Sequence, residues 1–267
     1  MNKRLAIIVA IIAVAGIGYL YWSKAPQSEE MRNVDMLSQA GVDIAEQDSV
    51  SYYGEAKGFY AAPSDVTKSY PGVVMIHEWL GLNDHIKDMA RQLAAQGYQV
   101  LAVDMYNGEV ASGPDRAREL SSGVRANMEE GNRNLRAAAD YLREQKADKI
   151  ASLGWCFGGQ QSLNLALSGE QLDATVIYYG NLVTDKEKLA ALKWPVLGIF
   201  GDADTAVPVQ SARDFDAALD ELGVENSIHI YPGLGHAFAN PSGMNYAAEA
   251  TKDAWAKTLA FLEANLK

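Results

Sequence analysis

Three residue types that can cooperate in nucleophilic catalysis follow one another along the chain, each in a glycine-rich segment. Cys156 lies in G-W-C-F-G-G, Asp202 and Asp204 lie in G-D-A-D-T-A-V-P, and His236 lies in G-L-G-H-A-F. A thiolate can attack a carbonyl carbon, an imidazole can take up and return the proton, and a carboxylate can orient the imidazole. Cys156, His236 and one of the two aspartates are therefore candidates for a catalytic triad.

These segments follow apolar runs that predict β-strands, and amphipathic runs between them predict α-helices. Strands are predicted at 72–76, 99–103, 149–155, 174–179, 196–200 and 227–231, after an edge hairpin at 50–62. Helices are predicted at 84–96, 115–145 with breaks at Gly123 and Gly131, 158–167, about 185–192, 209–222 and 244–265. This alternation predicts an α/β fold with a mostly parallel sheet and helices on both faces. Sites in such sheets form at the carboxyl ends of the strands.

Cys156 occupies the point where the strand at 149–155 should turn directly into the helix at 158–167. The pattern is G-x-S-x-G with cysteine in place of serine, and the central residue of such a turn has a strained backbone and an exposed side chain. Helix N-terminal amides would favour the thiolate, and the N–H of Phe157 could donate to an oxyanion. Glycine-rich turns also occur for packing alone, so the downstream acid and base strengthen the prediction.

The acid and the base follow in the chain order expected for such a nucleophile, each directly after a predicted strand. The other histidines are weaker candidates. His229 is predicted inside a strand, and His85 is predicted to open a helix in contact with solvent. His77 ends a strand near the expected site, where structural and catalytic roles are both open. The segment H-E-W-L-G lacks the second histidine of H-E-x-x-H, so no metal site is predicted.

Composition limits the classes of function. The chain has 267 residues, a formal net charge of −11 and one cysteine. So acidic a protein repels phosphate backbones, and we expect no nucleic acid partner. A single cysteine excludes a disulfide within the chain and a Cys-rich zinc site. The triad chemistry needs no cofactor, and none is predicted.

The first 24 residues differ from the rest. Lys3 and Arg4 precede the uncharged stretch Leu5–Trp22, which as a helix would span about 27 Å, close to the hydrocarbon core of a bilayer. We predict an uncleaved membrane anchor, with a cleaved signal peptide as the alternative. Positive charge ahead of the helix would put the body on the extracytoplasmic side, periplasmic or extracellular, or secreted after cleavage. The predicted organisation is an anchor at 1–24, a linker at 25–49 and one catalytic domain at 50–267.

Across residues 48–266 the chain resembles the dienelactone hydrolase family, a branch of the α/β-hydrolase fold. The three segments above and H-E-W-L-G-L-N, beginning at His77, support this resemblance. It implies a Cys-His-Asp triad, and the family's acid stands four residues before the proline of V-P, which selects Asp204 over Asp202. It also implies that Glu78 holds the resting thiol neutral until substrate displaces the carboxylate.

Part of this role for Glu78 also follows from physics. A carboxylate at the end of the first central strand would face Cys156, and a nearby negative charge disfavours a thiolate. A glutamate solvated in a surface loop is the alternative. In this fold the loop that holds Glu78 also supplies the second oxyanion donor, which would be the backbone N–H of Trp79 beside that of Phe157.

One departure from the family concerns the substrate. Members that act on dienelactone hold its carboxylate with two arginines, whose positions fall by spacing on Asn240 and near Gly108. Neither residue is basic, so recognition of a small anionic lactone is in doubt. Aromatic residues predicted near the site favour an apolar acyl or alcohol group; they are Trp79, Trp155, Phe157 and Phe238.

The features together predict a carboxylic ester hydrolase that cleaves a small ester or lactone through a thioester acyl-enzyme. Two alternatives remain open. One is a non-catalytic α/β-hydrolase-like binding protein at the membrane surface. The other is a thiol redox sensor, which would need an intermolecular disulfide or a sulfenic acid because the chain has no resolving cysteine. The sequence predicts no particular oligomeric state.

Overall fold

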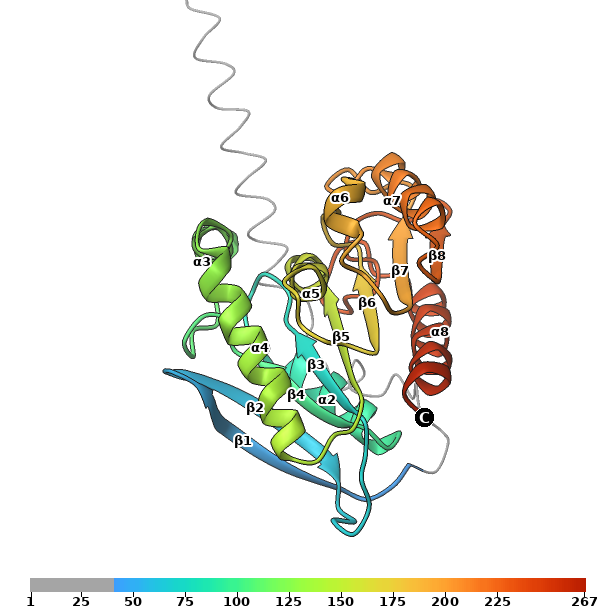
Figure 1. Ribbon diagram of the computed structural model, residues 1–267. Helices are drawn as coiled ribbons and strands as arrows, with labels where there is room; N and C mark the ends of the chain where they lie inside the picture. Colours follow the sequence, from blue (N-terminus) through green and yellow to red (C-terminus); the bar gives the residue numbers. More distant parts are fainter. Residues whose placement is uncertain (1–40) are drawn as a thin grey trace, which may run out of the picture. The chain divides into compact units, whose positions relative to one another are not determined.

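The computed structural model describes residues 41–267, whose strands form one 8-stranded sheet in the order β1-β2-β4-β3-β5-β6-β7-β8 (Figure 1). An antiparallel hairpin, β1 (Ile44–Tyr53) and β2 (Ala56–Pro63), forms one edge and joins the sheet through β4 (Gln99–Val103). From β4 onward, each strand pairs in parallel with its neighbour in the sheet. The remaining strands are β3 (Gly72–Ile76), β5 (Ile150–Trp155), β6 (Ala174–Tyr178), β7 (Val196–Gly201) and β8 (Asn226–Tyr231). The predicted edge hairpin and mostly parallel α/β sheet are confirmed.

Helices cover both faces of this sheet (Figure 1). They are α2 (Asp84–Ala95), α3 (Pro114–Ala126), α4 (Met128–Glu144), α5 (Phe157–Leu167), α6 (Lys186–Leu189), α7 (Val209–Glu221) and α8 (Ala248–Leu266). One apolar core joins strand residues such as Val74 and Leu101 to buried residues of α4, α5 and α7. The buried residues of α2 and α8 lie outside that core, because these helices cover the opposite face.

The main differences between predicted and observed element boundaries lie in three places. β1 begins at Ile44, so the last part of the predicted linker belongs to the sheet. The long helical stretch breaks at Asn127 (φ −127°, ψ 58°), and the two glycines predicted as breaks lie inside helices. The final helix begins at Ala248, because Asn240 starts a series of turns in which its side chain accepts hydrogen bonds from the N–H and hydroxyl of Ser242.

The parallel register brings the carboxyl ends of the central strands to one edge of the sheet. Ile76 pairs with Gly154, and Trp155 pairs with Tyr178. The residues that follow these strands therefore meet at this edge, although they lie far apart in the sequence.

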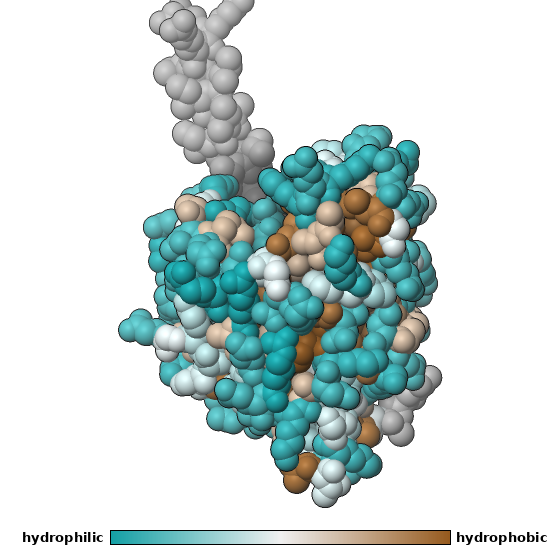
Figure 2. Space-filling model, in the orientation of Figure 1, coloured by the Kyte–Doolittle hydropathy of each residue, from teal (hydrophilic) through white to brown (hydrophobic). Residues whose placement is uncertain are grey.

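The predicted membrane anchor at 1–24 lies outside the described residues. Between residues 41 and 267, no helix has both the length and the apolarity that a membrane span requires. The face drawn in Figure 2 is mostly hydrophilic, with its hydrophobic residues in small separate patches.

Candidate active site

Cys156 has the strained backbone that its sequence position predicts. Its φ of 54° and ψ of −113° lie outside the regions that non-glycine residues favour. The turn needs glycine on both sides: a Cβ on Gly154 would stand 2.2 Å from the Gly158 carbonyl oxygen, and a Cβ on Gly158 would stand 2.2 Å from the Ile76 carbonyl oxygen. β5 thus passes directly into α5 and leaves the Cys156 side chain partly exposed.

The structure brings Cys156, His236 and Asp204 together. His236 Nε2 lies 3.1 Å from Cys156 Sγ, and His236 Nδ1 lies 2.8 Å from Asp204 Oδ2. The other carboxylate oxygen of Asp204 accepts hydrogen bonds from the backbone of Ala206 and Val207. Asp202 is exposed and accepts a hydrogen bond from the Gly233 N–H, not from His236. The acid that meets the histidine is Asp204, as the family pattern selects.

Opposing influences set the charges of Asp204 and His236. Burial acts to raise the pKa of Asp204, but the hydrogen bond from His236 and those from the backbone outweigh burial, and the pKa is lowered. Burial acts to lower the pKa of His236, but its contacts with Asp204 and Cys156 prevail and raise the pKa to about 10. Asp204 is therefore an acceptor, and His236 is stabilised in its protonated form beside the sulfur.

Glu78 lies against this group. The residue is only 6% exposed, so the alternative of a solvated loop glutamate is wrong. Its Oε2 accepts a hydrogen bond from Asn240 Nδ2. Burial raises the pKa of Glu78 to about 7, although the charge of His236 and the hydrogen bond from Asn240 oppose this rise. Glu78 therefore changes charge near neutral pH.

His77 has a structural role. It is fully buried, its Nδ1 lies 2.6 Å from the Glu78 carbonyl oxygen, and its Nε2 accepts the Met105 N–H at 3.3 Å. Both contacts fit a neutral ring with the proton on Nδ1, and burial lowers the pKa of His77 to about 4. The ring fixes the loop that contains Glu78 to the end of β4.

The remaining histidines lie on other elements. His229 lies in β8, as predicted, and its Nε2 is 3.0 Å from the Ser227 hydroxyl. His85 lies at the start of α2, as predicted, and is partly exposed. Burial of the rest of the ring lowers its pKa. Within the described chain, no cluster of three potential metal ligands comes together.

The predicted oxyanion donors follow two neighbouring strands of the sheet, β3 and β5. Phe157 is the first residue of α5, and Trp79 follows Glu78 after β3. Within residues 41–267 neither backbone N–H donates a hydrogen bond. Unpaired amides at a helix start and in the facing loop are the arrangement that an oxyanion hole uses.

Comparison with known proteins shows which family the chain belongs to. The family model described as "Dienelactone hydrolase family" matches residues 56–266. The chain belongs to the dienelactone hydrolase family.

Two relatives and one structure illustrate this membership. A Yersinia pestis protein named "Putative carboxymethylenebutenolidase" is 30% identical over 84% of this chain and 89% of its own length. Protein usf of Aquifex pyrophilus is 30% identical over 78% of this chain and 93% of its own. The crystal structure of a dienelactone hydrolase-like promiscuous phosphotriesterase from metagenomic libraries covers 84% of this chain and 99% of its own, at 25% identity and a TM-score of 0.75.

This dienelactone hydrolase family member has no cation at the two predicted carboxylate-binding positions. Asn240 donates its amide to Glu78. Gly108 lies in a turn with a φ of 85°, where its N–H donates to Asp104. Both residues make hydrogen bonds that hold the loops around the site in place.

Four aromatic residues were predicted near the site as a sign of an apolar substrate group, but three of them are buried and offer little exposed surface to a substrate. Trp155, Phe157 and Phe238 are buried at 5%, 1% and 0% exposure. Trp155 packs on Trp255 of α8, and Phe157 stacks on His77. These side chains support the site from beneath, and only Trp79 is partly exposed.

Two contact residues of the site were not predicted as such. Asn240 was considered only as a missing arginine, and Tyr179 was taken simply as the end of a strand. Tyr179 lies with its ring edge-on to the His236 ring, with 5.3 Å between centroids. A polar residue directly after a central parallel strand is the signal that could have indicated Tyr179.

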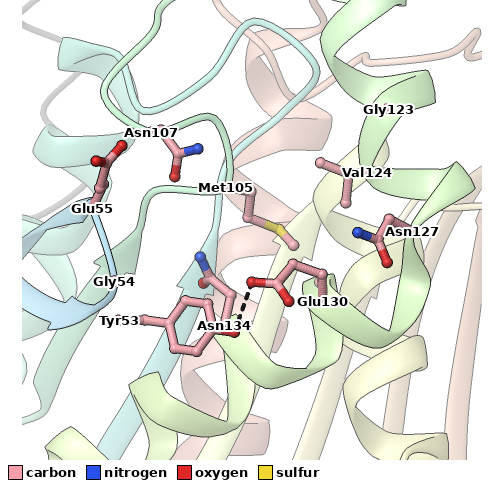
Figure 3. A pocket seen from close by; sticks show the side chains of 11 residues that line it. Tyr53, Gly54, Glu55, Met105, Asn107, Gly123, Val124, Asn127, Glu130 and Asn134 are labelled. Atoms are coloured by element: carbon pink, nitrogen blue, oxygen red, sulfur yellow. Dashed lines mark hydrogen bonds between the residues drawn. The ribbon is translucent and has the colours of Figure 1, made fainter.

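A cavity with a volume of about 310 Å³ lies away from the triad. The turn between β1 and β2, the loop after β4 and the α3–α4 junction line it, as Figure 3 shows. Its polar side chains include Glu130, whose carboxylate already accepts a hydrogen bond from Tyr53 at 2.7 Å. None of the triad residues lines this cavity.

Proposed function

We propose that this protein is a hydrolase of small carboxylic esters or lactones that uses Cys156 as the nucleophile and forms a thioester acyl-enzyme. The observation that carries the proposal is the 3.1 Å contact between His236 Nε2 and the Cys156 sulfur at a strained strand-to-helix turn. The curated relatives named as carboxymethylenebutenolidases support the same reaction class.

In the first half of the reaction the Cys156 thiolate attacks the carbonyl carbon, and the carbonyl oxygen gains negative charge. The unpaired N–H groups of Trp79 and Phe157 stabilise this oxyanion. The intermediate collapses to a thioester as the carbon–oxygen bond to the leaving group breaks. His236, held by Asp204, gives its proton to the departing oxygen.

In the second half a water molecule replaces the departed alcohol. Neutral His236 takes a proton from the water, and the resulting hydroxide attacks the thioester carbonyl. The carbon–sulfur bond breaks, the carboxylic acid leaves, and the thiolate and imidazolium are restored. For lactones the alcohol and the acid remain parts of one product.

The substrate class follows from the two positions that lack a cation. With Asn240 bound to Glu78 and Gly108 in a turn, neither residue can pair with a substrate carboxylate. The body is also strongly acidic, which disfavours approach of anions. We therefore expect neutral esters and lactones to be better substrates than their carboxylate-bearing analogues.

The decisive experiment compares wild type with Cys156→Ala on small neutral aryl esters. We expect kcat to fall by about 10³-fold or more, since removal of a nucleophile leaves only the contributions of binding and the oxyanion hole. Rapid quenching followed by mass spectrometry should show an acyl group on the Cys156 peptide of the wild type. Unchanged turnover in the variant would reject the mechanism. Absence of turnover in the wild type would favour a binding protein, and a sulfenic acid in place of the acyl group would favour a redox sensor.

We also propose that residues 1–24 anchor the protein in a membrane and place the catalytic domain on the extracytoplasmic side. The uncharged stretch Leu5–Trp22 after Lys3 and Arg4 supports this. In fractionated cells the full chain should remain in the carbonate-washed membrane pellet, and a chain that starts at residue 41 should stay in the supernatant. Recovery of the full chain in the supernatant, or of a product shortened at its N-terminus, would reject the anchor.

A further inference from the structure

Tyr179 directly follows β6 and points its side chain into the active site. Its backbone has a φ of 35°, which is unusual for a residue with a side chain. The ring is fully buried and packs edge-on against the rings of His236 and Phe238, with centroids 5.3 Å and 5.7 Å away. Strain that is tolerated beside reacting groups indicates a function for the residue.

The hydroxyl of Tyr179 is buried and, within the described chain, makes no hydrogen bond. Such orphaned hydroxyls are rare in folded proteins and unfavourable. The preceding residue is a natural comparison: Tyr178 is equally buried, but its hydroxyl lies 2.6 Å from the Thr258 hydroxyl. The contrast identifies the Tyr179 hydroxyl as a donor held ready for a partner.

The partner that the surroundings offer is the Glu78 carboxylate. Burial raises the pKa of Tyr179, the charges of Glu78, of the Cys156 sulfur and of the Tyr178 phenol raise it further, and the backbone N–H of Ala239 lowers it. The hydroxyl also lies near enough to help lower the pKa of Glu78. On the other side of the carboxylate, Asn240 already donates its amide to Oε2. Glu78 thus accepts a hydrogen bond from Asn240 and has the Tyr179 hydroxyl close enough to act as a second donor.

We propose that Tyr179 is a positioning residue whose hydroxyl serves as the second hydrogen-bond donor of Glu78 and keeps that carboxylate charged against the resting Cys156 thiol. The inference deepens the proposed function and rests on it, because it concerns the same nucleophile. Tyr179 acts through Glu78 and need not touch the substrate.

The sign of the effect follows from the groups around Glu78. His236, Asn240 and Tyr179 stabilise its anion, while burial opposes the charge. Loss of the hydroxyl raises the pKa of Glu78 further above about 7, so more of the protein holds a neutral Glu78 at neutral pH. A neutral carboxyl no longer repels a thiolate, and the resting thiol becomes more reactive.

The test is the rate at which iodoacetamide alkylates Cys156 in the full chain, measured from pH 5 to pH 9 without substrate. Tyr179→Phe removes the hydroxyl and keeps the ring. If the pKa of Glu78 rises by about half a unit, we expect alkylation relative to wild type to be about 1.5-fold faster near pH 7 and about 2.5-fold faster near pH 8, because these are the changes in the fraction of neutral Glu78. The matched control, Tyr178→Phe, loses a buried hydroxyl that bonds to Thr258, and should lower thermal stability without moving the pH profile.

Two further variants make the result decisive. Glu78→Gln should speed alkylation by itself, and adding Tyr179→Phe to it should change nothing more. Asn240→Ala, which removes the other donor, should act in the same direction as Tyr179→Phe. If Tyr179→Phe does not fold, Tyr179→Leu, which also lacks the hydroxyl, replaces it in every comparison. The proposal would be overturned if alkylation of Tyr179→Phe had the pH profile of wild type. It would also be overturned if Tyr179→Phe sped alkylation as much in the Glu78→Gln background as it does alone. Alkylation requires no ester turnover, so a failed ester assay would reject the proposed function separately.

Discussion

His236 is the residue at which the charges of the site converge. Its two ring nitrogens face a buried carboxylate and a sulfur, at 2.8 Å and 3.1 Å, and these contacts raise its pKa to about 10 despite burial. The histidine therefore favours an ion pair with the thiolate, whereas Glu78, when charged, opposes that thiolate. The reactivity of Cys156 before substrate binds depends on the balance of these two neighbours.

Sequence patterns indicated the residues that stand in short motifs, and missed those whose contacts are long-range. Cys156, Asp204 and His236 each follow a strand in a recognisable segment, so their meeting was predictable. The bond between Glu78 and Asn240 joins residues 162 positions apart, and spacing gives no sign of it. Side-chain direction was equally hidden: Phe157 is next to the nucleophile in sequence but points into the core.

At the scale of elements, apolar periodicity was sufficient to predict the strands and helices and insufficient for their ends. Buried strands such as β3 and β4 match their predicted bounds, because both of their faces are apolar. The helix breaks at Asn127 and not at the two glycines where a break was predicted. Glycine is only a weak helix breaker when tertiary packing supports the helix. β1 was predicted to begin later than it does, because most of its residues before Val50 are exposed and its pairing comes from backbone hydrogen bonds.

The contact between α5 and β3 is the element-level feature that positions the nucleophile, and it can be tested with two glycines. In Gly158→Ala the new Cβ would stand 2.2 Å from the Ile76 carbonyl oxygen, so α5 must move away from β3 and take Cys156 with it. We expect ester turnover to fall by about 100-fold, as a displacement of about 1 Å can cause, together with a lower melting temperature.

The control substitution is Gly123→Ala in α3, where a new Cβ has no atom within 4 Å. Alanine is favoured over glycine inside a helix by about 1 kcal/mol, so the melting temperature should rise slightly or stay the same and turnover should not change. Circular dichroism melts and aryl ester kinetics on both variants give the comparison. Wild-type behaviour of Gly158→Ala would show that the strand and the helix do not approach so closely.

At the scale of the whole molecule, the active site lowers the stability of the fold. Folding buries Glu78, an ionisable group, just past the carboxyl end of the central strand β3. The residues around it are apolar or hydrogen-bonded. The pKa of Glu78 rises on folding from its ordinary value of 4.5 to about 7. Between these two values the folded state binds more protons than the unfolded state, so stability falls as pH rises through this window.

Glu78→Gln should therefore stabilise the protein in a pH-dependent way, because glutamine has no charge to bury. The stability of the variant relative to wild type should grow by on the order of 2 kcal/mol between pH 5 and pH 8, most of the full effect of the pKa shift. Urea unfolding at both pH values measures the difference. The exposed Glu249→Gln on α8 is the control, since its carboxylate stays in water in both states. If the stability difference for Glu78→Gln were the same at pH 5 and pH 8, Glu78 would not titrate within this window in the folded protein, and the charge balance assigned to the resting thiol would be wrong.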